Sequence, residues 1–120
     1  MKYRESEETY LETILVLKKK LSIVRSVDVA TELNYSRPSV SRAVNLLLKK
    51  EYITIGKNGE INFTEAGYDR ANEVQERHSV MTQVFIDLGA SKEVAEENAC
   101  RVEHVITKDL FEILKNSIKK

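Results

Sequence analysis

The chain has 120 residues, of which 42% are hydrophobic, so it is long enough for one compact unit or for two small halves that share a core. It starts without an apolar signal segment and has no run near the ~18 apolar residues of a membrane helix, so we expect a cytoplasmic protein with no membrane partner. Its single cysteine, Cys100, excludes an internal disulfide framework, and its formal net charge of zero argues by itself against a polyanion-binding protein.

Two helices are predicted first, of which the second is short. Ser6 is followed by two glutamates and then by apolar residues at helical spacing, so we expect a helix over 7–20. A second helix follows Ser26 as its N-cap and ends near Asn34, a residue type that tolerates left-handed backbone. The side chains expected to face inward are Tyr10, Leu11, Ile14, Leu15, Leu17, Val27, Val29, Ala30 and Leu33.

A third helix and a hairpin follow. Pro38 stands in a first turn, where its missing N–H costs nothing. The apolar face of this helix is predicted to hold Val40, Ala43, Val44, Leu47 and Leu48, and its polar face Pro38, Ser41, Arg42, Asn45 and Lys49. Two stretches of alternating apolar residues, 53–55 and 61–63, flank a turn at 56–59, which is typical of a hairpin.

This order of elements predicts a winged helix-turn-helix that binds double-stranded DNA, over residues 1–64. These residues carry eleven Lys or Arg against eight Asp or Glu. Base edges in the major groove are expected to meet Arg37, Pro38, Ser39, Ser41 and Arg42. Phosphate contacts are expected from Ser26 and Lys57, with Arg4 and Arg25 as weaker candidates. Asn45 on the polar face of the third helix is a weaker candidate for DNA binding. The alternative is a module of this fold that makes protein contacts.

Residues 65–120 predict three further helices. Thr64 caps a long helix that ends at Gly89, Ser91 opens a helix over about 92–106, and Thr107 opens the last one. The long helix has a seam that invites a partner helix, formed by Ala71, Val74, His78, Met81, Phe85 and Leu88.

Residue types that bind transition metals gather in this second half. Cys100, Glu103 and His104 have the spacing i, i+3 and i+4, so they project from one helical face within reach of one ion, and Glu96 extends that face. His78 on the long helix is a further candidate ligand, and Glu12 a weaker one. The alternatives are a solvated charged face with a packed cysteine, a core histidine at position 78 and a surface carboxylate at position 12.

Five segments carry a resemblance to a known family: 6–12, 36–41, 63–67, 77–78 and 99–106. In order, and over nearly the whole chain, they resemble the diphtheria-toxin-repressor family of metal-dependent bacterial regulators, which includes the manganese transport regulators. The stretch Ala-Cys-Arg-Val-Glu-His-Val is the most specific. Because the chain stops after the sixth predicted helix, it is similar to the short members without a C-terminal barrel domain.

The resemblance implies a mainly α fold, with a winged helix-turn-helix at 1–64 and a helical metal-sensing and dimerisation domain at 65–120. It implies a homodimer that binds iron(II) or manganese(II) and then represses metal-uptake genes from a palindromic operator, with no small-molecule substrate. In the family, ligands come from the first helix and from the positions of His78, Cys100, Glu103 and His104.

The candidate ligand set is a hybrid within that family. Thr9 stands where iron-responsive relatives have methionine and manganese-responsive ones have aspartate, whereas Glu12 matches the manganese type and Cys100 the iron type. Glu96 and Thr82 occupy positions where iron-type members place the histidine and glutamate of an ancillary site, so that site is absent or rebuilt. Zinc(II) or nickel(II) are possible surrogates, because affinity order alone does not identify the physiological ion.

These assignments predict a clasp in which Glu12 of the DNA-binding half and the four ligand candidates of the second half share a cation. Filling the site is expected to fix the angle of each recognition helix for binding. Two alternatives stay open. One is a winged-helix repressor gated by an organic ligand or by oxidation of Cys100. The other is a small metalloenzyme or a nucleophile pair of Cys100 and His104, although we expect no enzyme.

Overall fold

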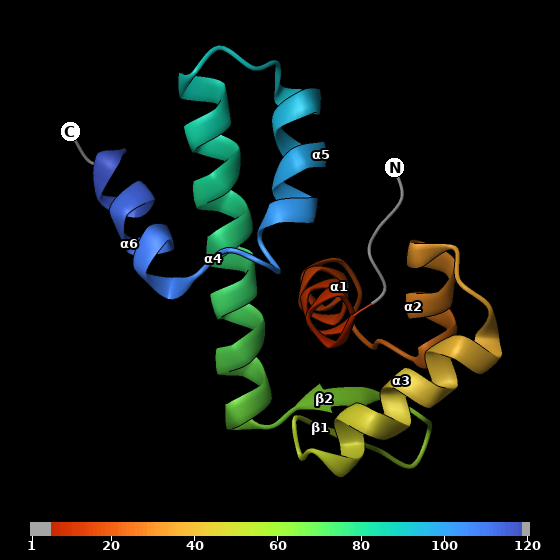
Figure 1. Ribbon diagram of the computed structural model, residues 1–120. Helices are drawn as coiled ribbons and strands as arrows, with labels where there is room; N and C mark the ends of the chain where they lie inside the picture. The colour runs from red at the N-terminus through yellow and green to blue at the C-terminus, as the bar shows by residue number, and fades with distance from the viewer. Residues whose placement is uncertain (1–5, 119–120) are drawn as a thin grey trace. The chain divides into compact units, whose positions relative to one another are not determined.

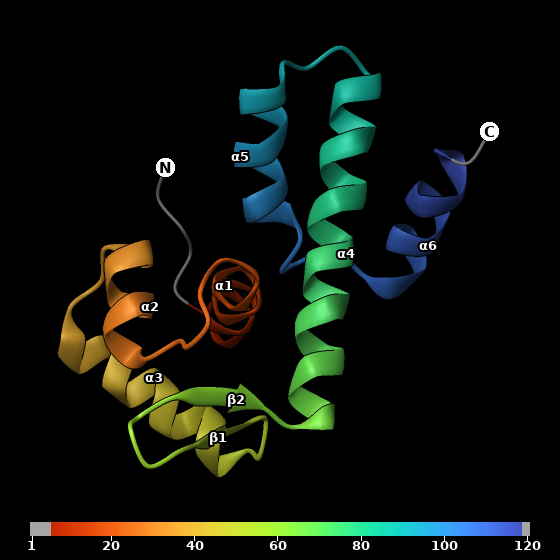
Figure 2. The ribbon, with the colours of Figure 1, turned by 180° about the vertical axis from the view of Figure 1, so that it is seen from behind.

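The computed structural model describes residues 6–118 (Figures 1 and 2). Its elements are α1 (Glu7–Lys20), α2 (Ser26–Leu33), α3 (Arg37–Lys49), β1 (Ile53–Ile55), β2 (Ile61–Phe63), α4 (Glu65–Asp87), α5 (Lys92–Val102) and α6 (Lys108–Ser117). Within the described residues the fold is mainly helical with one two-stranded hairpin, so the predicted fold class is confirmed. None of these helices is long and apolar enough to cross a membrane.

The chain divides into two compact units, which we call the N-terminal unit (Glu5–Asn72) and the C-terminal unit (Glu73–Lys120). The division falls inside α4. The predicted boundary after residue 64 stays a prediction.

Helix α1 of the N-terminal unit has its predicted bounds. The Ser6 hydroxyl accepts a hydrogen bond from the Thr9 N–H at 3.1 Å, which caps the first turn. That turn is acidic and the last turn is basic, as the helix dipole favours. The five apolar side chains predicted to face inward are all buried: Tyr10, Leu11, Ile14, Leu15 and Leu17.

Helices α2 and α3 pack on each other and on α1. Asn34 ends α2 in the left-handed region, with φ of 57°, and the Ser36 hydroxyl caps α3 by accepting the Ser39 N–H at 3.3 Å. The prediction of Ser26 as N-cap of α2 is wrong by one residue. Asp28 accepts the N–H of Arg25 at 2.8 Å, so Arg25 takes the cap position.

Two residues predicted to face the core of this unit are exposed, Val27 on α2 and Leu48 on α3. The buried residues of α3 are Val40, Val44 and Leu47, which share one face. Leu48 lies about 100° around the helix from Leu47 and therefore outside that face.

The hairpin pairs β1 with β2 in antiparallel register, with Ile53 opposite Phe63 and Ile55 opposite Ile61. Ile53 and Ile61 are buried. In the turn, Gly59 has a φ of 79°. Helix α4 starts against this hairpin at Gly67, where a Cβ atom would lie 1.8 Å from the Tyr52 carbonyl oxygen. Only glycine fits there.

The C-terminal unit packs α5 and α6 against α4. Figures 1 and 2 show α5 running antiparallel beside α4, with α6 on the opposite side of α4. Its core cluster joins α4 to α6 through Val80, Val84 and Phe111, with Phe85, Ile106, Leu114 and Ile118 packed against it.

Two predictions for this unit are wrong in detail. Helix α5 ends at Val102 and not at 106, since the N–H groups of Val105 and Ile106 both turn back to the Val102 carbonyl at 3.0 and 3.1 Å. The β-branched run over 105–107 weakens helix there, and Thr107 then caps α6. Leu88, predicted on the seam of α4, is 81% exposed because it lies beyond the last residue of that helix.

Candidate metal centre and nucleic-acid interface

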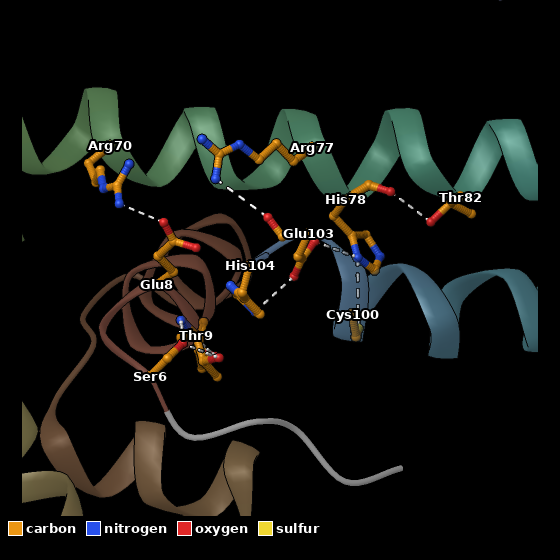
Figure 3. A network of polar contacts seen from close by, with 11 residues as sticks. Ser6, Glu8, Thr9, Arg70, Arg77, His78, Thr82, Cys100, Glu103 and His104 are labelled. Carbon is orange, nitrogen blue, oxygen red and sulfur yellow. Dashed lines mark hydrogen bonds and ion pairs between the residues drawn. The ribbon is translucent and has the colours of Figure 1, made fainter. Parts of the chain in front are cut away.

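Three side chains of different chemistry converge in the C-terminal unit (Figure 3). His78 projects from α4 and Cys100 from the last turn of α5, and Glu103 is the C-cap residue of α5. The His78 Nδ1 lies 3.1 Å from the Glu103 Oε2 and 3.8 Å from the Cys100 Sγ. The donor atoms of all three residues lie within 4.8 Å of one another. We call this cluster the triad.

The donor set of the triad fits a first-row transition metal ion. Imidazole nitrogen, thiolate sulfur and carboxylate oxygen are the ligand types that such ions take in proteins. Bonds of about 2.0–2.3 Å to one ion place neighbouring donors roughly 3–4 Å apart, and the contacts of His78 with Glu103 and Cys100 have that spacing. The site is also secluded, since Glu103 is 1% and Cys100 9% exposed.

Glu103 joins the triad to a second histidine. Its Oε1 lies 3.3 Å from the His104 Nε2, while its Oε2 faces His78. A single buried carboxylate therefore serves two imidazoles, which keeps its charge compensated in an apolar setting. The structure thus brings four of the predicted ligands, His78, Cys100, Glu103 and His104, into one connected group.

The triad also sets the protonation state of His78. Hydrogen bonds with Cys100 and Glu103 raise the pKa of His78 from 6.5 to about 10, against the opposing effect of burial. His78 therefore carries a proton at neutral pH when no metal is bound. Metal ligation requires the neutral imidazole, so binding a cation releases this proton.

The remaining predicted ligands belong to other segments of the chain. Thr9 and Glu12 belong to α1 of the N-terminal unit, where Thr9 is buried and its Oγ1 lies 3.0 Å from the Ser6 Oγ. Glu96 faces Lys92 on the surface of α5 at 3.9 Å, with 43% of its side chain exposed. The hydroxyl of Thr82 donates to the carbonyl of His78 at 2.8 Å.

The polar face predicted for α3 is exposed. Solvent reaches every residue of that face and the helix start, which together comprise Arg37, Pro38, Ser41, Arg42, Asn45 and Lys49. Ser39 differs, since its hydroxyl accepts hydrogen bonds from the Ser36 hydroxyl at 2.9 Å and from the Arg42 guanidinium at 3.3 Å. Ser39 thus orients Arg42 and completes the helix cap.

The residues predicted to contact phosphate differ in exposure and in hydrogen-bond partners. Lys57 is exposed at the hairpin turn, and Ser26 is half-buried in the first turn of α2. Arg25 is exposed, but its Nε donates to the Asn58 carbonyl at 2.8 Å, a contact with the hairpin that the sequence does not predict. Arg4 lies outside the described residues.

Sequence reasoning missed several ionic contacts that fix these elements. In the N-terminal unit Arg70 pairs with Glu8 at 2.6 Å, and Lys50 pairs with Glu7. In the C-terminal unit the Arg77 guanidinium donates to the Glu103 carbonyl at 3.4 Å, beside the triad (Figure 3). Because Arg70 and Glu8 are 62 residues apart, no local spacing could have indicated their contact.

Comparison with known proteins decides the family. Residues 2–60 match the model of the iron dependent repressor N-terminal DNA binding domain, and residues 64–120 match that of the iron dependent repressor metal binding and dimerisation domain. The chain belongs to the iron-dependent repressor family. It is therefore a metal-dependent transcriptional regulator of this family, and its class is not that of an enzyme.

Individual relatives of this chain are distant in sequence. It is 27% identical over 97% of its length to an uncharacterised helix-turn-helix transcriptional regulator of Methanocaldococcus jannaschii, of which it covers 94%. It is 28% identical over 91% of its length to the transcriptional regulator MntR of Escherichia coli, of which it covers 70%. The structure of the manganese regulator SloR matches 97% of the chain with a TM-score of 0.85 and 21% identity. The chain spans about half of SloR, with 54% of that chain covered, and the likeness shows the shared fold.

Proposed function

We propose that this chain forms a cytoplasmic homodimer that binds a palindromic operator when a divalent cation occupies the triad, and that it represses metal-uptake genes. The observation that carries the proposal is the triad itself, in which three donors of three chemical types lie within 4.8 Å of one another. A buried carboxylate with two histidine partners and a thiol has little structural purpose, because apolar residues of similar volume pack at lower cost.

His78, Cys100 and Glu103 are the proposed primary ligands, with His104 held beside them by Glu103. The bound cation supplies positive charge and Lewis acidity. Glu12 is the proposed ligand from α1, and Thr9 and Glu96 are weaker candidates. To turn a mostly incompetent regulator into a mostly competent one, the cation must favour the DNA-binding state by roughly 5 kcal/mol.

The donor set favours iron(II) over manganese(II) as the physiological ion. A thiolate is a soft ligand, whereas manganese(II) prefers carboxylate, carbonyl and water oxygens. Cys100 therefore contributes more to an iron(II) site than to a manganese(II) site. Zinc(II) and nickel(II) bind the same donors, and zinc(II) more tightly than iron(II), so we treat both as surrogates whose presence in a purified sample would not identify the natural ion.

The proposed DNA interface combines helix α3 with the hairpin. Arg37, Pro38, Ser41 and Arg42 are exposed near the start of α3, where a helix in the major groove presents side chains to base edges. Ser39, which orients Arg42, completes this set. Lys57 and Ser26 are the proposed phosphate contacts, and Arg4 is a further candidate. Asn45 of the α3 face is a weaker candidate for DNA binding.

Dimerisation is proposed through the C-terminal unit. Large apolar side chains are exposed there, as expected for a surface that a second copy covers: Ile86, Leu88, Val94, Val105, Leu110 and Ile113. Two copies related by a two-fold axis would present two α3 helices to half-sites about one DNA turn (~34 Å) apart.

The test is retention of palindromic DNA by the protein in chelator and after addition of iron(II), manganese(II) or zinc(II) under anaerobic conditions. We expect binding to appear only with metal and to be lost in His104→Ala, whose fold is checked by circular dichroism. Glu97→Ala is the matched control, because Glu97 pairs with Arg101 on the surface of α5, where Arg101 is exposed and Glu97 is half-exposed. Equal DNA binding with and without metal would overturn the proposal.

A regulator gated by oxidation of Cys100 is the second candidate. The Cys100 Sγ lies 3.8 Å from the His78 Nδ1, and a cysteine sulfur is the atom that peroxide oxidises. Chelator and peroxide separate the two functions, since a redox sensor responds to peroxide in chelator and a metal sensor does not.

A further inference from the structure

The base of the hairpin is anchored to the rest of the N-terminal unit. The N–H of Ile61 donates to the Val24 carbonyl at 2.7 Å, so the residue before Arg25 pairs with β2. The Lys18 ammonium donates to the Ile61 carbonyl at 2.9 Å and to the Asn62 side chain at 3.0 Å. These contacts hold the strands and do not reach the turn.

The turn itself, residues 56–59, is what we call the wing tip. Its connection to α2 is the hydrogen bond from the Arg25 Nε to the Asn58 carbonyl, at 2.8 Å. Its other hydrogen bonds in the described chain are internal to the hairpin: Gly56 N–H to the Glu60 carbonyl, Gly59 N–H to the Gly56 carbonyl, and Asn58 N–H to the Glu60 carboxylate.

The backbone around Arg25 is held in place by hydrogen bonds. Its own N–H is held by the Asp28 carboxylate at 2.8 Å, and the neighbouring Val24 carbonyl is held by β2. A guanidinium is planar and rigid, so a bond through Nε fixes the direction of the whole group. The side chain therefore transmits the position of the α2 N-terminus to the wing tip.

We propose that Arg25 is a positioning residue for DNA binding, which holds the wing tip and Lys57 beside the N-terminus of α2. The inference rests on the proposed function, because it assumes that the N-terminal unit binds DNA. A four-residue turn with two glycines loses conformational entropy when it is ordered on a phosphate backbone. Ordering it in the free protein removes that cost from the binding step. Arg25 thus acts through Lys57 and does not contact a phosphate itself.

The first measurement uses the free full-length protein. Amide hydrogen exchange at Gly56, Asn58 and Gly59 is compared between wild type, Arg25→Gln and Arg25→Lys. Loss of one hydrogen bond is expected to speed exchange at the wing tip about five-fold and to leave Ile61 unchanged. Lys20→Gln, which removes an exposed cation at the end of α1, is the control and should change nothing. Unchanged exchange in Arg25→Gln would overturn the proposal.

The second measurement is a double-mutant cycle on DNA affinity with Arg25→Gln and Lys57→Ala. If Arg25 acts through the wing tip, its substitution costs affinity in the wild type and little more once Lys57 is gone. Additive losses, or wild-type affinity in Arg25→Lys, would assign Arg25 to a direct phosphate contact and overturn the proposal. If wild type binds no DNA with any metal, the proposed function fails, whereas the exchange measurement still reports whether Arg25 orders the wing tip.

Discussion

Replacing Glu103 by glutamine tests the candidate metal centre most sharply, because this carboxylate touches both histidines. The change keeps the size of the side chain and one oxygen acceptor but removes the negative charge. Glu103 is 1% exposed, and its two oxygens lie 3.1 Å from the His78 Nδ1 and 3.3 Å from the His104 Nε2. Solvent therefore does not replace what the carboxylate provides.

Two magnitudes follow from this geometry. Hydrogen bonds to charged groups contribute about 1.5–3 kcal/mol each. Glutamine keeps one oxygen acceptor, so the free energy of unfolding of the metal-free variant should fall by about one such contribution. Loss of a partner outside the ligand shell already costs 10–100-fold in metal affinity, so loss of a charged ligand should cost at least about 100-fold, or roughly 2.7 kcal/mol.

The assay is titration of iron(II) and manganese(II) by calorimetry under anaerobic conditions, together with urea unfolding in chelator. Glu97→Gln is the matched control, since this residue lies on α5, the helix that Glu103 caps, and pairs with Arg101 at the surface. The reasoning is refuted if Glu103→Gln binds either metal as tightly as Glu97→Gln does.

Three further predictions follow from single positions. Cys100→Asp should shift preference from iron(II) toward manganese(II), because an oxygen donor replaces a soft sulfur; competition between the two ions measures this, and an unchanged ratio speaks against Cys100 as a ligand. The pKa of His78 is raised to about 10, so in chelator its contribution to stability is full below about pH 6.5 and is lost as the pH rises through 10. The difference in unfolding free energy between wild type and His78→Gln should therefore shrink across that window, and a constant difference would contradict the assignment. Gly67→Ala should destabilise the N-terminal unit by about 2 kcal/mol or more, because its Cβ would lie 1.8 Å from the Tyr52 carbonyl oxygen. The melting temperature is compared with that of Ala66→Gly. Equal melting temperatures would show that the backbone shifts to accommodate the Cβ, against this prediction.

Much of the fold could be predicted because its signals are local. Caps at Ser6, Ser36, Ser91 and Thr107 each accept an N–H three residues on, and the sequence shows them directly. The end of α5 was harder, since the apolar pattern continues past Val102 while the backbone turns. Tertiary contacts and the β-branched run at 105–107 determine where α5 ends. The periodicity of apolar residues gives no information about either.

The candidate site was predictable in part for a similar reason. Cys100 and Glu103 follow helical spacing, and His78 stood out as a polar residue on an apolar seam. The contact of Arg25 with Asn58 joins residues 33 apart, and no sequence pattern marks it. Sequence reasoning therefore assigned Arg25 to phosphate, whereas the structure gives its guanidinium a partner within the protein.

The central claim is that a metal ion binds the triad through Cys100. X-ray absorption at the iron edge of the iron(II)-loaded protein measures this directly, with Cys100→Ser as the comparison. The account predicts a sulfur neighbour of iron in the wild type that is absent in the variant, beside nitrogen and oxygen neighbours in both. An all-oxygen and nitrogen shell in the wild type, identical to that of Cys100→Ser, would contradict it.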